Sequence, residues 1–183
     1  ITMKDRIYPF TVKMYYKAYQ HIDMIETWVE VSHKEKKAVV LKRFDSGHFL
    51  IRRGDVWISS LHGHWGAETQ LESEPLVSGM KVMKNMDGIR NGLGDHSEVM
   101  FSLDGKPQEN SGRVIGAALC WSGRTKIRVD MDDTFGRFVH SVFAGMNEEA
   151  SEYKLEPGEV FATPVLALTY SQEGVGGASR NFP

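Results

Sequence analysis

Apolar and polar residues alternate with a period of two along most of this sequence, which is the pattern of a β-strand with one buried face. Residues such as Met14 and Tyr16 share one face of the segment 11–17, and the segment 25–31 repeats the pattern. A turn at His21–Asp23 would join these two strands in a hairpin. Helical periodicity is nearly absent, so the pattern predicts an all-β fold. The other predicted strands are Ala38–Phe44, Val56–Leu61, Trp65–Glu72, Gly79–Lys84, Val99–Leu103, Val114–Trp121, Thr125–Met131, Phe138–Phe143 and Val165–Tyr170.

Turns that contain glycine or proline separate most of these predicted strands, as expected for strands joined by short β-turns. The spacing leaves no helical crossover of roughly 10–15 residues, which a parallel sheet would need. The sequence therefore predicts one large antiparallel sandwich over residues 1–172 and argues against a nucleotide-binding α/β fold. Residues 173–183 include a glycine-rich stretch, which we interpret as the start of a linker.

The composition excludes several classes of partner. Lys and Arg number 22 against 24 Asp and Glu, for a net charge of −2, so the basic excess of nucleic-acid-binding proteins is missing and we expect no nucleic-acid partner. No stretch approaches the roughly 20 apolar residues that span a bilayer, so we expect no membrane insertion. The single cysteine, Cys120, allows no intrachain disulfide and no cysteine-based zinc site, and its apolar neighbours predict a buried, inert thiol.

Trp65 is the clearest candidate for contact with a ligand. It follows His62-Gly63-His64 and precedes Glu68. An aromatic ring beside imidazole and carboxylate groups suits a sugar, because a pyranose ring stacks on it while the polar groups bind the hydroxyls. We interpret His64, Trp65 and Glu68 as candidate sugar contacts, with core packing of Trp65 as the alternative. No metal site is predicted, because a ligand four residues along a straight strand lies roughly 13 Å away.

A second candidate is a glycine-rich loop predicted over Asp87–Ser97, where glycines permit close approach of the backbone to a ligand. Asp95 and His96 are its candidate binding residues. The acidic run Asp130–Asp133 is interpreted as solvated, because carboxyl groups that cleave glycosidic bonds lie about 5–9.5 Å apart on opposite sides of the bond. No residue of the chain is assigned a catalytic role.

The C-terminal third carries the most specific motif. Leu155-Glu156-Pro157-Gly158-Glu159-Val160-Phe161-Ala162-Thr163-Pro164 resembles the last strands of the N-terminal domain of glycoside hydrolase family 36 α-galactosidases. Ser111–Gly123 and Leu61–Trp65 resemble the same family, and they occur in the family's order. The resemblance covers most of the chain.

This resemblance implies a β-supersandwich like that of galactose mutarotase, placed before a (β/α)₈ barrel that carries both catalytic aspartates. Such enzymes hydrolyse terminal α-galactosides with retention and need no cofactor. Residues 1–172 would then be a truncated supersandwich that lacks upstream strands, and residues 173–183 would lead toward the absent barrel. The implied partners are that barrel, the galactoside substrate of the full enzyme and further copies of the protein. The implied location is the bacterial cytoplasm, with the periplasm as the alternative.

Two interpretations of function follow. In the first, the chain is an accessory domain of an α-galactosidase, supports oligomerisation and helps to shape the active site, but is inactive alone. In the second, it is a free-standing carbohydrate-binding module or a mutarotase-like aldose epimerase, for which His64 and Glu68 would be nominated as acid and base. In either case, exposed edges near Ile1–Lys17 are expected to pair two copies in a dimer.

Overall fold

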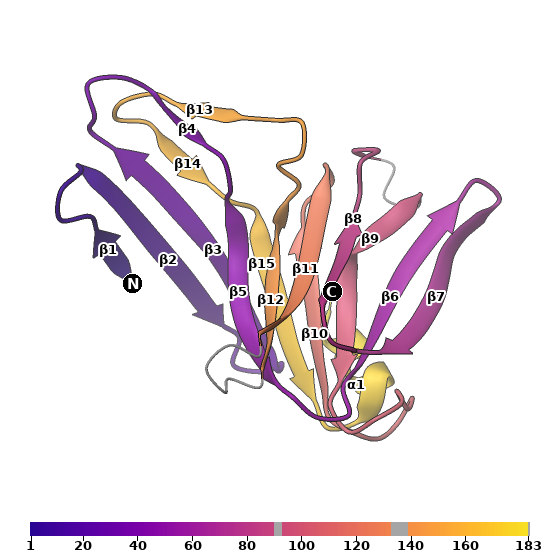
Figure 1. The fold of residues 1–183 in the computed structure, drawn as a ribbon. Helices are drawn as coiled ribbons and strands as arrows, with labels where there is room; N and C mark the ends of the chain where they lie inside the picture. Colours follow the sequence, from indigo (N-terminus) through magenta and orange to yellow (C-terminus); the bar gives the residue numbers. More distant parts are fainter. Residues whose placement is uncertain (90–92, 133–138, 183) are drawn as a thin grey trace.

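The computed structural model of the chain describes residues 1–89, 93–132 and 139–182. Within these ranges the chain forms fifteen strands and one helix, which confirms the all-β expectation. The strands are arranged in a nine-stranded, a four-stranded and a two-stranded sheet, and the pairing within each is antiparallel (Figure 1). The predicted antiparallel sandwich is therefore correct.

The large sheet has the order β1-β2-β3-β15-β10-β9-β6-β7, with β14 also paired to β3. The four-stranded sheet has the order β5-β12-β11-β8, and β13 pairs with β4. The strands of the large sheet are β1 (Thr2–Lys4), β2 (Phe10–Ala18), β3 (Met24–His33), β6 (Trp57–His64), β7 (Ala67–Pro75), β9 (Gly94–Ser102), β10 (Val114–Cys120), β14 (Val160–Ala162) and β15 (Val165–Ser171). The others are β4 (Val39–Leu41), β5 (Asp45–Arg52), β8 (Met80–Lys84), β11 (Thr125–Asp132), β12 (Val139–Met146) and β13 (Tyr153–Leu155).

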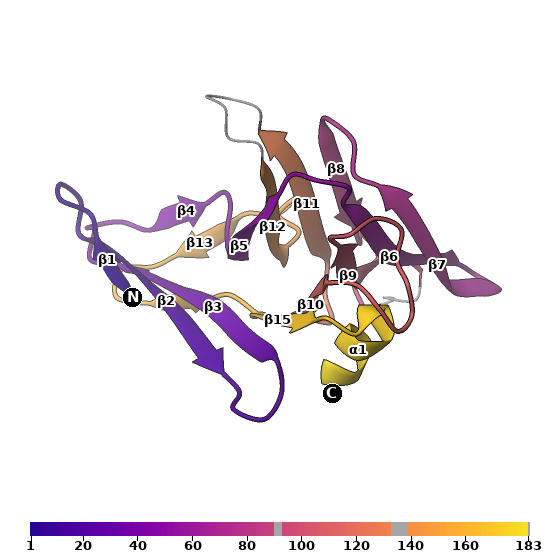
Figure 2. The same cartoon turned by 90° about the horizontal axis from the view of Figure 1, so that it is seen from below.

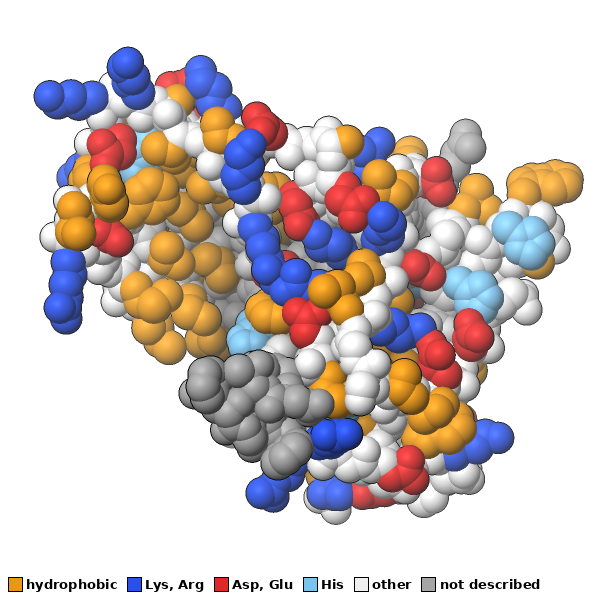
Figure 3. All heavy atoms as spheres, viewed as in Figure 1, with side chains coloured by type: hydrophobic (Ala, Val, Ile, Leu, Met, Phe, Trp, Pro, Cys, Tyr) orange, Lys and Arg blue, Asp and Glu red, His pale blue; other side chains and the backbone are white. Residues whose placement is uncertain are grey.

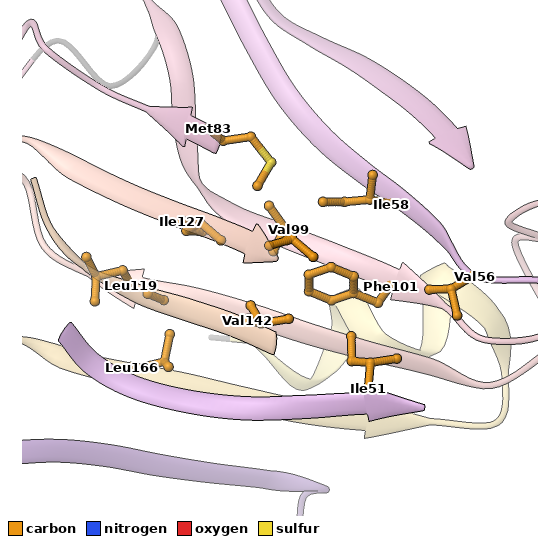
Figure 4. Close-up of a cluster of buried hydrophobic side chains, with 13 residues drawn as sticks. Ile51, Val56, Ile58, Met83, Val99, Phe101, Leu119, Ile127, Val142 and Leu166 are labelled. Carbon is orange, nitrogen blue, oxygen red and sulfur yellow. The ribbon is translucent and has the colours of Figure 1, made fainter. Parts of the chain in front are cut away.

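The hydrophobic core lies between the large sheet and the four-stranded sheet (Figure 4). The inward residues of β9 and β15, such as Phe101 and Leu166, are fully buried there. They meet Ile127 and Val142 from the opposite sheet, which are buried to the same degree. The alternation in the sequence thus places one face of each strand in this core, as the period of two requires.

The four-stranded sheet is narrower than the large sheet, so β1, β2 and β3 extend beyond it (Figures 1 and 2). We call the face of these three strands that points toward the four-stranded sheet the wing. Thr27 of β3 pairs with the core residue Leu166 of β15, so its side chain points toward the four-stranded sheet. Tyr16 of β2 pairs with Thr27 and therefore lies on the same face. Met14 and Val29, which pair two residues further along, share this face as well. Tyr16 is 56% exposed, and hydrophobic side chains gather on this part of the surface in Figure 3.

Helix α1 (Gly174–Asn181) packs on the opposite, outer face of the large sheet (Figure 2). A Cβ on Gly116 of β10 would lie 2.8 Å from Cε2 of Phe182, so this glycine is what lets the end of the helix segment approach the strand. Gly176, Gly177 and Ala178 are buried in the contact. Small residues thus serve here for close packing of the helix on the sheet. The interpretation of residues 173–183 as the start of a linker stays a prediction.

The alternation predicted no strand for β5. It did not delimit the three-residue strands β1, β13 and β14 either, although Ile1–Lys17 was expected to form an exposed edge and the family resemblance implied strands around β13 and β14. It also gave β4 too many residues, since only Val39–Leu41 is extended and paired. Phe138, the predicted first residue of β12, lies outside the described residues.

Candidate functional site

The first candidate site lies on the β6–β7 hairpin. His64 ends β6, Trp65 and Gly66 form a two-residue turn, and β7 begins at Ala67. The prediction of a strand running from Trp65 to Glu72 is thus wrong at its start, and His64 and Glu68 lie on two different strands. Gly66 makes the turn possible, because its φ of 79° is disfavoured for residues with a side chain.

Trp65 projects from this turn with 87% of its surface exposed, so the alternative of core packing does not apply. The backbone N–H of Gly66 donates to Glu68 Oε1 at 3.0 Å. This bond lowers the pKa of Glu68, and the nearby His64 adds a smaller effect in the same direction. The turn therefore carries an exposed indole beside an ionised carboxylate, which could contact a sugar but does not enclose one.

The second pair of candidates belongs to a strand and not to a loop, because β9 begins at Gly94. Asp95 Oδ2 accepts a hydrogen bond of 2.9 Å from the backbone N–H of Lys84 in β8. Asp95 thereby ties the large sheet to the four-stranded sheet. The side chain of His96 is only 11% exposed, and its Nδ1 lies 3.3 Å from Glu98 Oε1. The middle of the predicted glycine loop, residues 90–92, lies outside the described residues.

The five candidate residues lie near one end of the large sheet, since His62 pairs with Asp95 where β6 meets β9. Their side chains do not converge on one site. Asp95 and His96 are adjacent in a strand and point to opposite faces, while Trp65 points into solvent. Among the described residues, no group of three or more His, Cys, Asp or Glu side chains could hold a metal ion. A sugar-binding role for the five residues stays a prediction.

Two other groups from the sequence have structural explanations. Asp130 Oδ2 lies 3.0 Å from Nε of Arg128, in a pair on β11. Cys120 is exposed, which corrects the expectation of a buried thiol. Desolvation and the negative charge of Glu26 nevertheless raise the pKa of Cys120, so the thiol form is favoured and the residue is a poor nucleophile.

The sequence did not predict a groove of about 570 Å³ on the outer face of the large sheet, which we call the outer groove. It is bounded by the β6–β7 hairpin, by the loop between β9 and β10, and by α1. Its apolar lining includes Leu61, Leu71, Met100, Val175 and Phe182. These residues come from distant parts of the sequence. One local signal pointed to the groove: Leu61 and Leu71 are apolar although they lie on the strand face that points away from the core.

Several solved structures have a fold similar to that of this chain. The structure matches the crystal structure of the GH36 α-galactosidase AgaB from Geobacillus stearothermophilus with a TM-score of 0.91 and 25% identity, over 98% of this chain and 24% of that one. It also matches a putative aldose 1-epimerase from Escherichia coli K12 with a TM-score of 0.54 and 11% identity, over 94% of this chain and 64% of that one. The fold is thus a β-sandwich shared with a solved α-galactosidase and with a putative aldose 1-epimerase.

Sequence comparison gives the family. Residues 1–156 match the model of the glycosyl hydrolase family 36 N-terminal domain, and the chain belongs to this family. The curated α-galactosidase Mel36A of Lactobacillus acidophilus is 28% identical to it over 182 residues, which are all of this chain and 24% of the relative. The chain therefore spans about a quarter of the length of the curated relatives that it matches. No helix among the described residues is long and apolar enough to cross a membrane.

Proposed function

We infer that this chain is the N-terminal accessory domain of a retaining α-galactosidase that hydrolyses terminal α-galactosides. The observation that supports this proposal is the family match over residues 1–156. In addition, the whole of this chain aligns with an α-galactosidase that is about four times as long. The catalytic carboxylates of such an enzyme belong to a barrel, at the C-terminal ends of its strands. They would lie in the remaining three quarters of the parent protein.

The test compares two proteins. The isolated 183-residue chain should release no nitrophenol from a nitrophenyl α-galactoside above a mock preparation, because retaining hydrolysis needs two carboxyl groups about 5–5.5 Å apart. The natural gene product that contains residues 1–183 should release it readily. Activity of the isolated chain, or a gene product that ends near residue 183, would overturn the proposal.

A mutarotase-like epimerase is the second candidate, and the observation that favours it is the match in fold to a putative aldose 1-epimerase. Its nominated acid and base, His64 and Glu68, flank an exposed turn where water has free access. An epimerase needs both groups beside one enclosed sugar ring. Polarimetry of fresh α-galactose separates the candidates, because an epimerase accelerates mutarotation and an accessory domain does not.

The accessory role includes association between copies of the chain. The wing presents partly exposed apolar side chains, such as Met3, Tyr16 and Ile25, beside the outermost strand β1. Apolar surface and an unpaired strand edge together favour strand pairing with a second copy. We expect the isolated chain to dimerise through this region at concentrations from about micromolar upward.

A further inference from the structure

His33 is a buried histidine on the wing that belongs to none of the sites described above. It is the last residue of β3 and is only 2% exposed. It follows Thr27 by an even number of residues, so its side chain points to the same face of the strand, toward the four-stranded sheet. On that face it contacts Leu155, the fully buried last residue of β13. His33 is therefore enclosed between the end of the wing and the β4–β13 pair that partly covers it (Figure 1).

Both ring nitrogens of His33 have a partner, and the two partners determine where the proton lies. Nε2 is 2.9 Å from the carbonyl oxygen of Leu155, which can only accept a hydrogen bond, so Nε2 carries a proton and donates. Nδ1 is 3.1 Å from the backbone nitrogen of Glu35, whose N–H can only donate, so Nδ1 carries no proton and accepts. The site therefore holds the neutral imidazole in one tautomer and has no place for a second ring proton.

The contacts of the ring offer little compensation for a positive charge. Among the described residues, the ion pairs that include a histidine are those of His62 and His96, so no carboxylate lies within ion-pair distance of His33. The ring of Phe10 stacks on the imidazole, with centroids 5.4 Å apart, and its face attracts cations but cannot accept the Nδ1 proton. Protonation would thus place two donors, Nδ1–H and the Glu35 N–H, against each other in a buried site.

The charged groups of the surrounding elements have other partners or are exposed. The residues that β2 places on this face are uncharged, and so is the whole of β4. In the β1–β2 loop, Asp5 accepts hydrogen bonds from two backbone N–H groups of that loop. In β13 and the turn after it, Lys154 pairs with Glu156 at 2.7 Å, and Glu159 accepts from the backbone N–H of Glu156. The segment that follows β3 carries Lys34, Glu35, Lys36 and Lys37. Its net positive charge disfavours a further positive charge on the ring.

His33 holds the β13–β14 turn from two sides. Its ring binds the carbonyl oxygen of Leu155 before the turn, and its own carbonyl oxygen accepts a hydrogen bond of 2.9 Å from the N–H of Gly158 within the turn. A protonated ring needs water for its second N–H, so it must leave the enclosed position and give up the bond to Leu155. The β13–β14 turn and the β4–β13 pair then lose an attachment to the wing.

We propose that His33 is a pH-sensitive latch that holds the β4–β13 pair and the β13–β14 turn over the end of the wing. The latch is closed while the ring is neutral. A histidine in contact with water has a pKa of about 6.5, so below this pH the open form binds one proton more than the closed form. The free energy of opening therefore falls as the pH falls. The inference is independent of the proposed function, because it uses only contacts within this chain.

Amide hydrogen exchange of the 183-residue chain measures this opening. The N–H groups of Gly158 and Glu35 are protected by His33 itself, so they report on the latch. After correction for the intrinsic pH dependence of exchange, their opening constants should rise between about pH 6 and pH 5 by up to about tenfold per pH unit, the limit for uptake of one proton. Amides of β10 in the core are the reference and should show no such rise.

His33→Gln is the test variant, because its side-chain amide can still donate to Leu155 but does not take up a proton. The pH dependence of opening at Gly158 should disappear in this variant, whatever its absolute opening constant. His21→Gln is the matched control, because His21 is exposed between β2 and β3, at the far end of the same hairpin. This control should keep the full pH dependence.

The same pH dependence in wild type and in His33→Gln would overturn the proposal. A matching rise at the β10 amides of the wild type would also overturn it, because the whole chain would then be unfolding in acid. Nitrogen NMR of the wild-type ring gives a test that needs no substitution. It should show a proton on Nε2 and none on Nδ1 at neutral pH, and the opposite tautomer would refute the latch.

Discussion

Two halves of the large sheet have the same backbone architecture and very different surroundings. In the covered half, β15, β10 and β9 face the four-stranded sheet, and inward residues such as Val99, Phe101 and Leu166 are at most 1% exposed. In the wing, β2 and β3 pair over nine residues in the same antiparallel manner, yet Tyr16 and Ile25 are 56% and 45% exposed. The alternating pattern thus determines which face is apolar, but not whether anything covers it.

The comparison separates two sources of stability. Hydrogen bonding between strands is common to both halves, while burial of apolar surface, at about 25 cal/mol per Å², is concentrated in the covered half. The wing has only partial cover, from the segment around β4 and β13 near one end. Loss of side-chain volume in the covered half should therefore strongly lower the free energy of unfolding. Substitutions in the wing should mainly change the dissociation constant for self-association.

The largest effect is expected for Phe101→Ala. Phe101 is fully buried between the sheets and meets Phe49 edge to face, with the ring centroids 6.1 Å apart. The substitution should lower the free energy of unfolding by about 3–5 kcal/mol, because it removes buried surface and leaves a cavity. Tyr16→Ala in the wing is the control, with an expected change within about 0.5 kcal/mol in the monomer. Urea denaturation measures both, and equal losses would show that the wing is covered after all.

The second effect concerns association of the isolated chain. Tyr16→Lys places a charge on the wing and should weaken the dimer at least about tenfold, which corresponds to about 1.4 kcal/mol. Leu50→Lys on the four-stranded sheet is the control and should leave the dissociation constant unchanged. Sedimentation velocity from about micromolar concentration upward provides the measurement. A wild-type chain that stays monomeric over this range would mean that the edge near β1 is already protected.

The alternating segments were predictable from sequence because their signal is local. The strands β2, β3, β10 and β15 were located within a few residues, and the residues that share one face of β2 and of β3 were assigned correctly. Strand β5 was missed because Asp45-Ser46-Gly47 resembles a turn. In the structure Gly47 lies in the strand, where a Cβ would be 2.6 Å from Cδ2 of Leu166. The glycine reflects close contact between two sheets, which no local pattern reveals.

The candidate sites show the same limit. Trp65 resembles a strand residue in sequence, and only the pairing of His64 with Ala67 reveals a hairpin turn. Asp95 and His96 were grouped as members of a predicted glycine-rich loop, but both lie in strand β9, where adjacent side chains point to opposite faces. The outer groove combines three segments that are distant in sequence, so its recognition required the tertiary arrangement.

A third, smaller effect should appear at low pH in the covered half. Asp104 and Arg113 bracket the β9–β10 loop, with Arg113 Nε 3.0 Å from Asp104 Oδ1 and the Arg113 N–H 2.8 Å from Oδ2. These contacts, with the guanidinium group contributing most, lower the pKa of Asp104 to about 2. In the unfolded chain the pKa of an Asp carboxyl group is about 3.9. The contribution to stability is therefore complete above about pH 4 and is lost as the pH falls toward 2.

Asp104→Asn should consequently reduce the steepness with which stability falls between about pH 4 and pH 2, and added salt should have a similar but weaker effect. Asp5, in the loop between β1 and β2, is the matched control, because backbone N–H groups of Tyr8 and Ile7, and not a cation, lower its pKa. Acid titration of both carboxyl groups by NMR measures the difference. A salt response for Asp5 as large as that for Asp104 would contradict the assignment of causes.

The smallest effect on folding is expected for Trp65→Ser. The indole is 87% exposed on its turn, so its removal should change the free energy of unfolding by no more than about 0.5 kcal/mol. The same position is nevertheless informative, because a fully solvated indole emits at long wavelength and becomes accessible to quenchers. In the isolated chain, iodide should quench a component of the fluorescence that is missing from Trp65→Ser. If Trp65 contacts a sugar, millimolar melibiose should protect that component, since stacking removes one ring face from solvent. Quenching that melibiose leaves unchanged would reject the sugar-contact prediction for Trp65 without affecting the comparison of wing and covered half, because this turn belongs to neither.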